Sequence, residues 1–200
     1  MLSRLEDRLH RIGLAYAGNS INTDIFRKNA ISTWRDPNGS LYAVCCYYNP
    51  IGRIIIAVSD TTFTWKHIKT RFRGDLRDAH NCVCCIIDGD GFVHLALARH
   101  DGQLRYAVSD IPCPALYIDP SPTDFSYHEG IIGQNEDRVT YPEFYLQPSG
   151  DLLFLHRQGA SANGDLVVDR YLTREKHWER VQDSLITGEG RLSRVSIGRF

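Results

Sequence analysis

Short apolar runs of strand length recur along the chain, and a glycine stands just before each of them. Three segments share one order: a turn glycine, an apolar run, a second glycine 11 to 14 residues after the first, and another run. The first glycines are Gly39, Gly91 and Gly150, so successive units begin 52 and then 59 residues apart. Such hairpins at a period of about 50 residues are typical of propeller blades with four strands each.

The residues that precede these glycines are also typical of hairpin turns. Asn38-Gly39, Asp90-Gly91 and Asp101-Gly102 favour tight turns, because those turns require a positive φ angle. Helical periodicity is weak outside residues 1–11, which are charged and amphipathic. We therefore predict an all-β fold. Its blade-like units lie around residues 39–66, 91–110 and 150–180.

Two tryptophans occupy equivalent places in their units. Trp65 and Trp178 follow the second glycine of the first and third units by 13 and 14 residues. A large aromatic ring at that place could seal the gap between neighbouring blades.

The chain is too short for a closed ring of such blades. At about 50 residues per blade it holds three units and an N-terminal strand or two, whereas the smallest propellers have four blades. We therefore expect a propeller fragment of about three four-stranded antiparallel blades at residues 12–190, between an N-terminal segment at 1–11 and a divergent tail at 191–200. The chain is then a truncated form of a longer protein, which we favour, or it closes by self-association, or its open blade edges stay exposed.

The composition is typical of a folded globular domain, since 42% of the residues are hydrophobic and 24% are charged. The net charge of −1 gives no general attraction to nucleic acid or to an anionic membrane. No apolar run reaches the ~18 residues of a membrane span, and residues 1–11 contain no apolar core of a signal peptide. We expect neither nucleic acid nor a membrane as a partner, and a polyanion would need a local cluster of charges.

The chain has six cysteines, a residue type that can bind metal ions, and four of them fall in segments that are typical of buried strands. Cysteines in such places usually pack as small apolar side chains with free thiols. Zinc sites need ligands at CxxC-like or HxxxH-like spacing, which Cys82-Val83-Cys84-Cys85 lacks. We therefore predict no metal site from these cysteines.

Several short motifs resemble those of one family of repeat proteins. They are Gly13-Leu14-Ala15-Tyr16-Ala17-Gly18-Asn19, Phe26-Arg27-Lys28-Asn29, Asp78-Ala79-His80-Asn81, Asp88-Gly89-Asp90-Gly91 with His94 and His100, Thr140-Tyr141-Pro142-Glu143-Phe144, and Phe154-Leu155-His156-Arg157-Gln158-Gly159 with Asn163-Gly164-Asp165-Leu166. Through them, residues 12–190 resemble the neuraminidase-type (BNR) repeat family, which includes the ulvan lyases. The resemblance implies a seven-bladed propeller in a full-length protein, a carbohydrate ligand, and a secreted or periplasmic location.

The match departs from the family at two places. Ser59-Asp60-Thr61-Thr62-Phe63-Thr64-Trp65 is similar to the Asp-box of sialidases, but its spacing differs and the turn glycine is missing. The tail at residues 191–200 loses the resemblance where a next blade would begin, which suits a truncated or altered end.

Four polar residues stand where strands begin or end. His80 precedes the apolar run 82–87 and His100 follows the run 92–98, so an antiparallel pairing would bring both to one end of a sheet. Tyr141 begins a strand, and Arg157 ends the strand that starts at residue 152. Ligands of propellers bind at such an end.

These residue types suit a lyase that cleaves a uronate polysaccharide by β-elimination. The reaction removes a proton beside a carboxylate, neutralises that carboxylate and protonates the leaving oxygen. His and Tyr can serve as base and acid, and Arg can grip the carboxylate. In the lyases that this chain resembles, two histidines, a tyrosine and an arginine carry these roles, and the resemblance places them on His80, His100, Tyr141 and Arg157.

A second set of residues would contact the substrate: Asn81, His94, Arg27 and Asn163. Structural alternatives remain open for several residues. His80 and His100 could be turn residues, Tyr141 a tyrosine at the edge of the core, and His94 a packed histidine in register with apolar neighbours. We expect His156 to face away from Arg157, because neighbouring residues of a strand point to opposite sides.

The leading functional hypothesis is therefore an acidic-polysaccharide lyase, or a truncated relative of one, that needs no cofactor and no metal. A non-catalytic propeller that binds carbohydrate is the alternative, because many propellers only bind. A glycoside hydrolase of the sialidase kind is less well supported, since it would need an arginine cluster. An inactive fragment is also consistent with the sequence.

Overall fold

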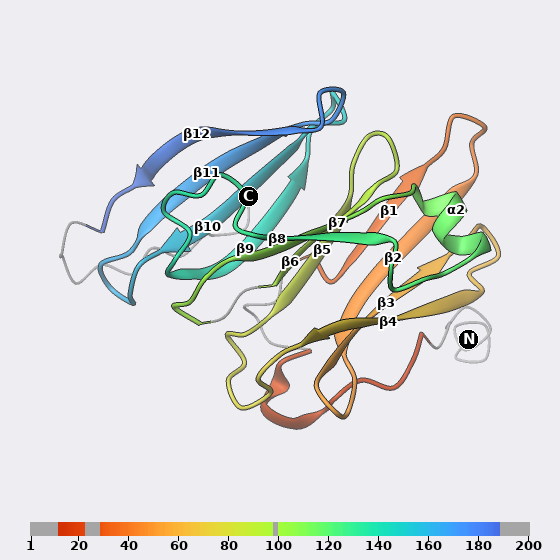
Figure 1. Ribbon diagram of the computed structural model, residues 1–200, viewed down its shortest axis with the longest axis horizontal. Coiled ribbons are helices and arrows are strands. Elements are labelled where there is room, and N and C mark those ends of the chain that lie inside the picture. The colour runs from red at the N-terminus through yellow and green to blue at the C-terminus, as the bar shows by residue number, and fades with distance from the viewer. Residues whose placement is uncertain (1–11, 23–28, 98–99, 189–200) are drawn as a thin grey trace, which may run out of the picture.

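The computed structural model describes residues 12–22, 29–97 and 100–188. The N-terminal segment 1–11, Arg27 and the tail 191–200 lie outside the described residues. The described residues form three four-stranded antiparallel sheets, which lie side by side (Figure 1). The all-β propeller fragment predicted from the sequence is confirmed, and the three repeat units lie one in each sheet.

Each sheet is a blade in which the strands follow one another in chain order. The first blade consists of β1 (Ile31–Arg35), β2 (Leu41–Tyr48), β3 (Arg53–Ser59) and β4 (Trp65–Arg73). The second blade consists of β5 (Val83–Ile87), β6 (Val93–Leu97), β7 (Arg105–Ser109) and β8 (Phe125–Glu129). The third blade consists of β9 (Val139–Leu146), β10 (Leu152–Gln158), β11 (Asp165–Leu172) and β12 (His177–Ile186).

Two short helices interrupt this pattern. The 3-10 helix η1 (Gly18–Ser20) precedes the first blade, and the α-helix α2 (Cys113–Ile118) lies between β7 and β8. Pro112 caps α2, and Cys113 and Leu116 point into the core. Six residues are too few to produce a helical period in the sequence, so the pattern did not predict this helix.

The first strands of the blades, β1, β5 and β9, are neighbours. Asn29 connects two of them: the amide of Cys85 in β5 donates to its backbone oxygen at 2.8 Å, and the amide of Phe144 in β9 donates to its Oδ1 at 2.7 Å. Loops that enter or leave these strands at the same end are therefore held close together.

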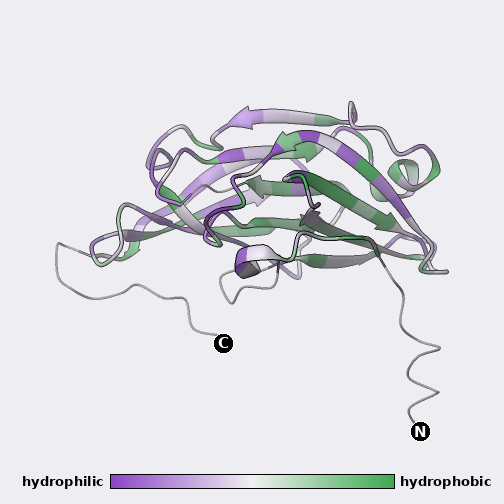
Figure 2. Ribbon diagram, turned by 90° about the horizontal axis from the view of Figure 1, so that it is seen from below, coloured by the Kyte–Doolittle hydropathy of each residue, from purple (hydrophilic) through white to green (hydrophobic). Residues whose placement is uncertain are grey.

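Two apolar cores fill the spaces between the blades. Val44, Cys46 and Tyr48 of β2 point into the core between the first and second blades, as expected for alternating residues of a strand. Phe144 and Phe154 point into the core between the second and third blades. In Figure 2, apolar and polar positions alternate along several strands.

The two tryptophans differ in what they cover. Trp178 lies in the core between the second and third blades, where its ring meets that of Phe154 at 6.1 Å between centroids. Trp65 instead packs with Tyr47 and Ile55 on the face of the first blade that is turned away from the second. A gap between blades is therefore filled by Trp178, whereas Trp65 covers an outer face.

The second and third blades approach each other closely at two glycines. The amide of Gly89 donates to the backbone oxygen of Gly150 at 2.9 Å, and a Cβ at Gly89 would lie 2.5 Å from the Gly150 Cα. Gly150 also has a φ of +91°, which favours glycine. Side chains at these two positions would push the blades apart.

The six cysteines are free thiols, and five of them are buried. Burial raises the pKa of the Cys84 thiol, which suits a packed apolar role. Among the helices of the described residues, none is long and apolar enough to cross a membrane.

Candidate functional site

His80 and His100 lie together at one end of the second blade. His80 stands in the connection that leads into β5, and His100 stands in the connection between β6 and β7. Because β5 and β6 pair in antiparallel fashion, these two connections meet at the same end of the sheet. The imidazole rings stack with 4.2 Å between their centroids and 17° between their planes.

Asp78 is shared by the two histidines. Its Oδ1 lies 2.5 Å from the Nδ1 of His80, and its Oδ2 lies 2.8 Å from the Nδ1 of His100. An ionised carboxylate only accepts hydrogen bonds, so each Nδ1 carries a hydrogen. In the neutral form, each ring then has its lone pair on Nε2, which is the atom that can accept a proton.

The same contacts keep the Asp78 carboxylate ionised. Partial burial alone would raise its pKa, but hydrogen bonds from the His80 amide and from both histidine rings outweigh this effect and lower the pKa to about 2. Asp78 was noted in the sequence only as part of a motif. Its position two residues before His80 is the sequence feature from which its contact with the histidines could have been predicted.

Asn81 holds the loop that carries His100. Its Oδ1 accepts a hydrogen bond from the backbone amide of His100 at 2.7 Å, and its Nδ2 donates to the backbone oxygen of Asp75 at 3.0 Å. The Tyr48 hydroxyl donates to the backbone oxygen of Asn81 at 2.7 Å. Asn81 is only 7% exposed, so its contacts fix the position of the histidine pair.

Tyr141 faces this pair from the third blade. Thr140 pairs with Arg157 and Glu143 pairs with Leu155, so Tyr141 lies in a bulge of β9. Its φ is +57°, a left-handed conformation that costs a bulky residue about 1–3 kcal/mol. Its ring centroid lies 5.8 Å from that of His80. A strained bulge that turns a side chain toward a cluster of polar groups is a common feature of functional sites.

Arg157 of β10 completes the cluster. Its Cζ lies 4.9 Å from the centroid of the Tyr141 ring, and its Nη2 donates to the Thr140 hydroxyl at 3.0 Å. Its Nε donates to the backbone oxygen of Gly159 at 3.1 Å. Although Arg157 is only 7% exposed, no carboxylate among the described residues pairs with it. A buried guanidinium without an acidic partner is costly, and an anionic ligand would remove that cost.

Thr140 links the two blades at this place, and the sequence reasoning did not single it out. Its hydroxyl accepts a hydrogen bond from the Asp101 amide at 2.9 Å as well as the one from Arg157. Arg138 binds the Asp101 carboxylate through two nitrogens, at 3.0 and 2.7 Å. The loop that follows His100 is thus fixed to the strand that carries Tyr141.

The other expected contact residues lie elsewhere. His94 is fully buried at the opposite end of β6, where its Nε2 lies 3.1 Å from Asp88 Oδ2 and its Nδ1 lies 2.6 Å from the Tyr106 hydroxyl. Asn163 is exposed in the loop between β10 and β11. His156 is buried between neighbouring strands and its Nε2 lies 3.0 Å from the Asn135 backbone oxygen, so it faces away from the cluster.

Asp78, His80 and His100 also have ligand atoms within 4.8 Å of one another, which is close enough for a metal ion. A set of two histidines and one carboxylate would suit several transition metals. However, the two rings are nearly parallel, and each Nδ1 already binds its own oxygen of Asp78. This arrangement favours hydrogen bonding and proton transfer over a shared ion.

Comparison with known proteins relates the chain to polysaccharide lyases. A family model described as "BNR repeat-containing family member" matches residues 42–195. The long-isoform ulvan lyase of Glaciecola sp. (strain KUL10) is 26% identical over 60% of this chain and 15% of its own length. The short-isoform ulvan lyase of Alteromonas sp. (strain LOR) is 24% identical over 60% of this chain and 30% of its own length. The chain thus spans less than a third of these relatives.

Solved structures show the same fold. The crystal structure of polysaccharide lyase Uly1 aligns with a TM-score of 0.68 and 20% identity, over 90% of this chain and 46% of the other. A PL25 ulvan lyase bound to -[GlcA(1-4)Rha3S]- aligns with a TM-score of 0.56 and 18% identity, over 85% of this chain and 38% of the other.

Proposed function

Because the chain belongs to the BNR repeat-containing family, we propose that it carries the acid–base site of a lyase that cleaves acidic, uronate-containing polysaccharides of the ulvan type by β-elimination. The site consists of His80, His100, Tyr141 and Arg157, with Asp78 as a positioning residue.

The buried guanidinium of Arg157 is the observation that carries this proposal. Four other arginines of the described residues pair with carboxylates, as Arg170 does with Asp151 at 2.7 Å, whereas Arg157 is distinguished by being buried at 7% exposure. Arg157 has no such partner among the described residues, and it lies against the ring of Tyr141. A substrate carboxylate could fill this place, because the planar guanidinium binds carboxylates through two nitrogens.

The same residues can account for each step of the elimination. Arg157 pairs with the uronate carboxylate and thereby acidifies the proton on the adjacent ring carbon. The Nε2 of His80 accepts that proton, while Asp78 holds the ring and stabilises the imidazolium that forms. The electron pair of the broken C–H bond forms a double bond with the next carbon, whose bond to the glycosidic oxygen breaks. The Tyr141 hydroxyl donates its proton to that leaving oxygen.

The remaining expected residues have supporting parts in this proposal. Asn81 keeps the His100 loop in place through its hydrogen bond to the backbone. Asn163 is exposed in the loop that follows Arg157, where it could bind sugar hydroxyls. His94 supports the wall between the blades and does not meet the substrate.

The proposal is tested by replacing Arg157 and measuring the ultraviolet absorbance of the unsaturated uronate product from ulvan. We expect the unmodified chain to release this product, Arg157→Ala to lose activity by roughly two orders of magnitude or more, and Arg157→Lys to recover part of it. Arg170→Ala is the matched control, because it removes a surface guanidinium, and it should keep full activity.

A modified substrate separates the role of the uronate charge from that of the sugar's shape. Ulvan with its carboxylates reduced to alcohols should not be cleaved by any variant, because the proton to be removed is no longer acidified. If the folded chain binds ulvan but releases no unsaturated product, the lyase assignment is wrong and a carbohydrate-binding propeller takes its place.

A further inference from the structure

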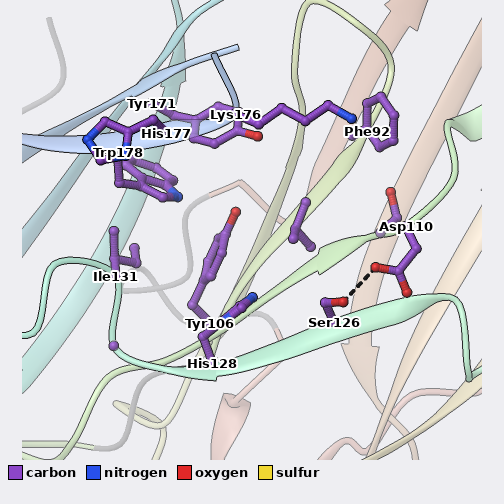
Figure 3. Close-up of a pocket in the computed structure, with 13 residues that line it drawn as sticks. Phe92, Tyr106, Asp110, Ser126, His128, Ile131, Tyr171, Lys176, His177 and Trp178 are labelled. Carbon is purple, nitrogen blue, oxygen red and sulfur yellow. Dashed lines mark hydrogen bonds between the residues drawn. The ribbon is translucent and has the colours of Figure 1, made fainter. Parts of the chain in front are cut away.

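A cavity lies between the outer strands of the second and third blades (Figure 3). Its volume is about 510 Å³, and its walls come from β7, β8 and the turn between β11 and β12. None of the residues of the histidine cluster lines it. The cavity is therefore separate from the site described above, which lies at the ends of β5, β6 and β10.

The floor of this cavity is aromatic and closely packed. Tyr106, Tyr171 and Trp178 form it, and each is at most 9% exposed. The Trp178 ring meets Tyr106 edge-on at 5.7 Å and Tyr171 at 5.1 Å between centroids. Because the rings hold one another, the floor needs little reorganisation to receive a ligand.

The rim is polar and combines residues of both blades. On the second blade, the Ser126 hydroxyl donates to the Asp110 carboxylate at 2.6 Å, and the exposed His128 ring stacks on Tyr106. On the third blade, the Lys176 ammonium lies 4.6 Å from the centroid of the Phe92 ring, which belongs to the second blade. Figure 3 shows Lys176 beside Phe92, Ser126 bonded to Asp110, and His128 next to Tyr106.

An aromatic floor below a rim of donors and acceptors fits the surface of a sugar ring. The C–H face of a pyranose can pack on aromatic rings while its hydroxyls bind carboxylate, hydroxyl and ammonium groups at the edge. A purely apolar ligand would desolvate Asp110 and Lys176 without compensating them. The volume lies within the range of about 300–1,000 Å³ that is usual for small-ligand sites.

We propose that this cavity is a second saccharide-binding site, which holds one or two sugar units of a glycan without cleaving them. Its lining residues include no arginine and no pair of stacked histidines, so it lacks the arrangement that we propose for the elimination. The choice of an ulvan-type glycan as its ligand rests on the proposed function, whereas the existence of a sugar site rests on the cavity alone. Bound there, a long glycan would be anchored at a second point on the same chain.

The experiment is a titration of the His80→Ala chain with ulvan oligosaccharides, followed by NMR of the indole N–H signals. His80→Ala prevents cleavage, so binding is measured by itself. We expect the Trp178 signal to shift in a saturable way, because its ring forms the floor, whereas Trp34 and Trp65 lie outside the cavity and serve as internal references. Absence of a Trp178 shift would overturn the proposal.

Two rim variants show whether the shift comes from this cavity. Asp110→Ala and Lys176→Ala remove exposed side chains and leave the floor intact, so we expect each to weaken the affinity reported by Trp178 at least tenfold. Lys69→Ala, an exposed residue of β4, is the control and should change nothing. Equal affinity in all three variants would also overturn the proposal.

A kinetic comparison keeps this proposal separate from the lyase proposal. In the chain with His80 intact, Lys176→Ala should raise KM for long ulvan and leave the cleavage of short oligosaccharides unchanged. If no substrate is cleaved but Trp178 still responds, the lyase assignment fails and the saccharide site stands. If cleavage occurs and the Trp178 signal does not shift, the lyase assignment stands and the saccharide site fails.

Discussion

The two ends of β6 hold the same three residue types in opposite environments. At one end, Asp78 and His80 have side chains that are 38% and 29% exposed, and Tyr141 faces them. At the other end, Asp88, His94 and Tyr106 form a chain of hydrogen bonds whose members are at most 4% exposed. We refer to them as the open set (Asp78, His80, Tyr141) and the closed set (Asp88, His94, Tyr106).

The closed set is not suited to acid–base catalysis, because its polar groups are buried and bonded to one another. Both nitrogens of His94 are engaged, and burial lowers the pKa of its imidazole. Burial also raises the pKa of the Tyr106 hydroxyl far above its usual value. His94 and Tyr106 therefore keep fixed protonation states near neutral pH. In the open set, the shared carboxylate orients the rings through their Nδ1 atoms, so that Nε2 is the atom that can accept a proton. Solvent access, and not residue type, separates a reactive set from a structural one.

The largest expected effect is on catalysis in the open set. His80→Ala removes the proposed base, and loss of such a group lowers rates by roughly 10²–10⁴-fold. We expect this loss in kcat for ulvan with only a small decrease in the free energy of unfolding, because the His80 ring is partly exposed and its hydrogen bond to Asp78 is one of several that this carboxylate accepts. Initial rates of product formation and urea unfolding curves measure the two quantities. A variant with nearly full activity would remove His80 from the mechanism.

The matching change in the closed set should act on stability. His94→Ala leaves a cavity and a buried Asp88 Oδ2 without its partner, which should cost about 3 kcal/mol of unfolding free energy. Urea unfolding followed by tryptophan fluorescence measures this loss. The activity of the fraction that remains folded should stay within about twofold of normal. A stable His94→Ala chain that has lost its activity would contradict the division into two sets.

The smallest effect concerns the pH dependence of stability at Asp78. Its pKa is about 2 in the folded chain and 3.8 as the ordinary value, so its ionised form stabilises the fold above about pH 4. This contribution is lost as the pH falls from 3.8 to about 2, because the carboxyl group then takes up a proton in both states. The difference in unfolding free energy between the unmodified chain and Asp78→Asn should therefore decrease as the pH falls from 3.8 to about 2. Unfolding curves at several pH values test it, and a difference that grows below pH 3.8 would contradict it.

Much of the fold follows from patterns that are local in the sequence. The glycine-bounded runs predicted hairpins, and their period predicted blades, because turn chemistry and strand alternation act over a few residues. The helix α2 escaped this reasoning, since its six residues are specified by their burial against the core. The different places of Trp65 and Trp178 also depend on which blade neighbours which.

The sequence predicted only the part of the site whose residues lie at the ends of predicted strands. The antiparallel pairing of β5 with β6 brings His80 and His100 together, and the sequence pattern was enough to predict this pairing. The role of Thr140 depends on contacts between blades, and the conformation of Tyr141 depends on a bulge in the register with β10. The pattern placed His94 among packed residues, but its partners Asp88 and Tyr106 became evident only from the structure.

The measurement that tests the account most directly compares Tyr141→Phe with Tyr106→Phe in one assay of unsaturated product from short ulvan oligosaccharides, whose cleavage does not depend on the second saccharide site. Each substitution removes a single hydroxyl from a tyrosine that neighbours a histidine, one in the open set and one in the closed set. We predict that Tyr141→Phe loses product formation by roughly two orders of magnitude or more, because the leaving oxygen is no longer protonated. Tyr106→Phe should keep its activity and lose only stability. Equal losses in both variants, or a loss in Tyr106→Phe alone, would contradict the assignment of the site.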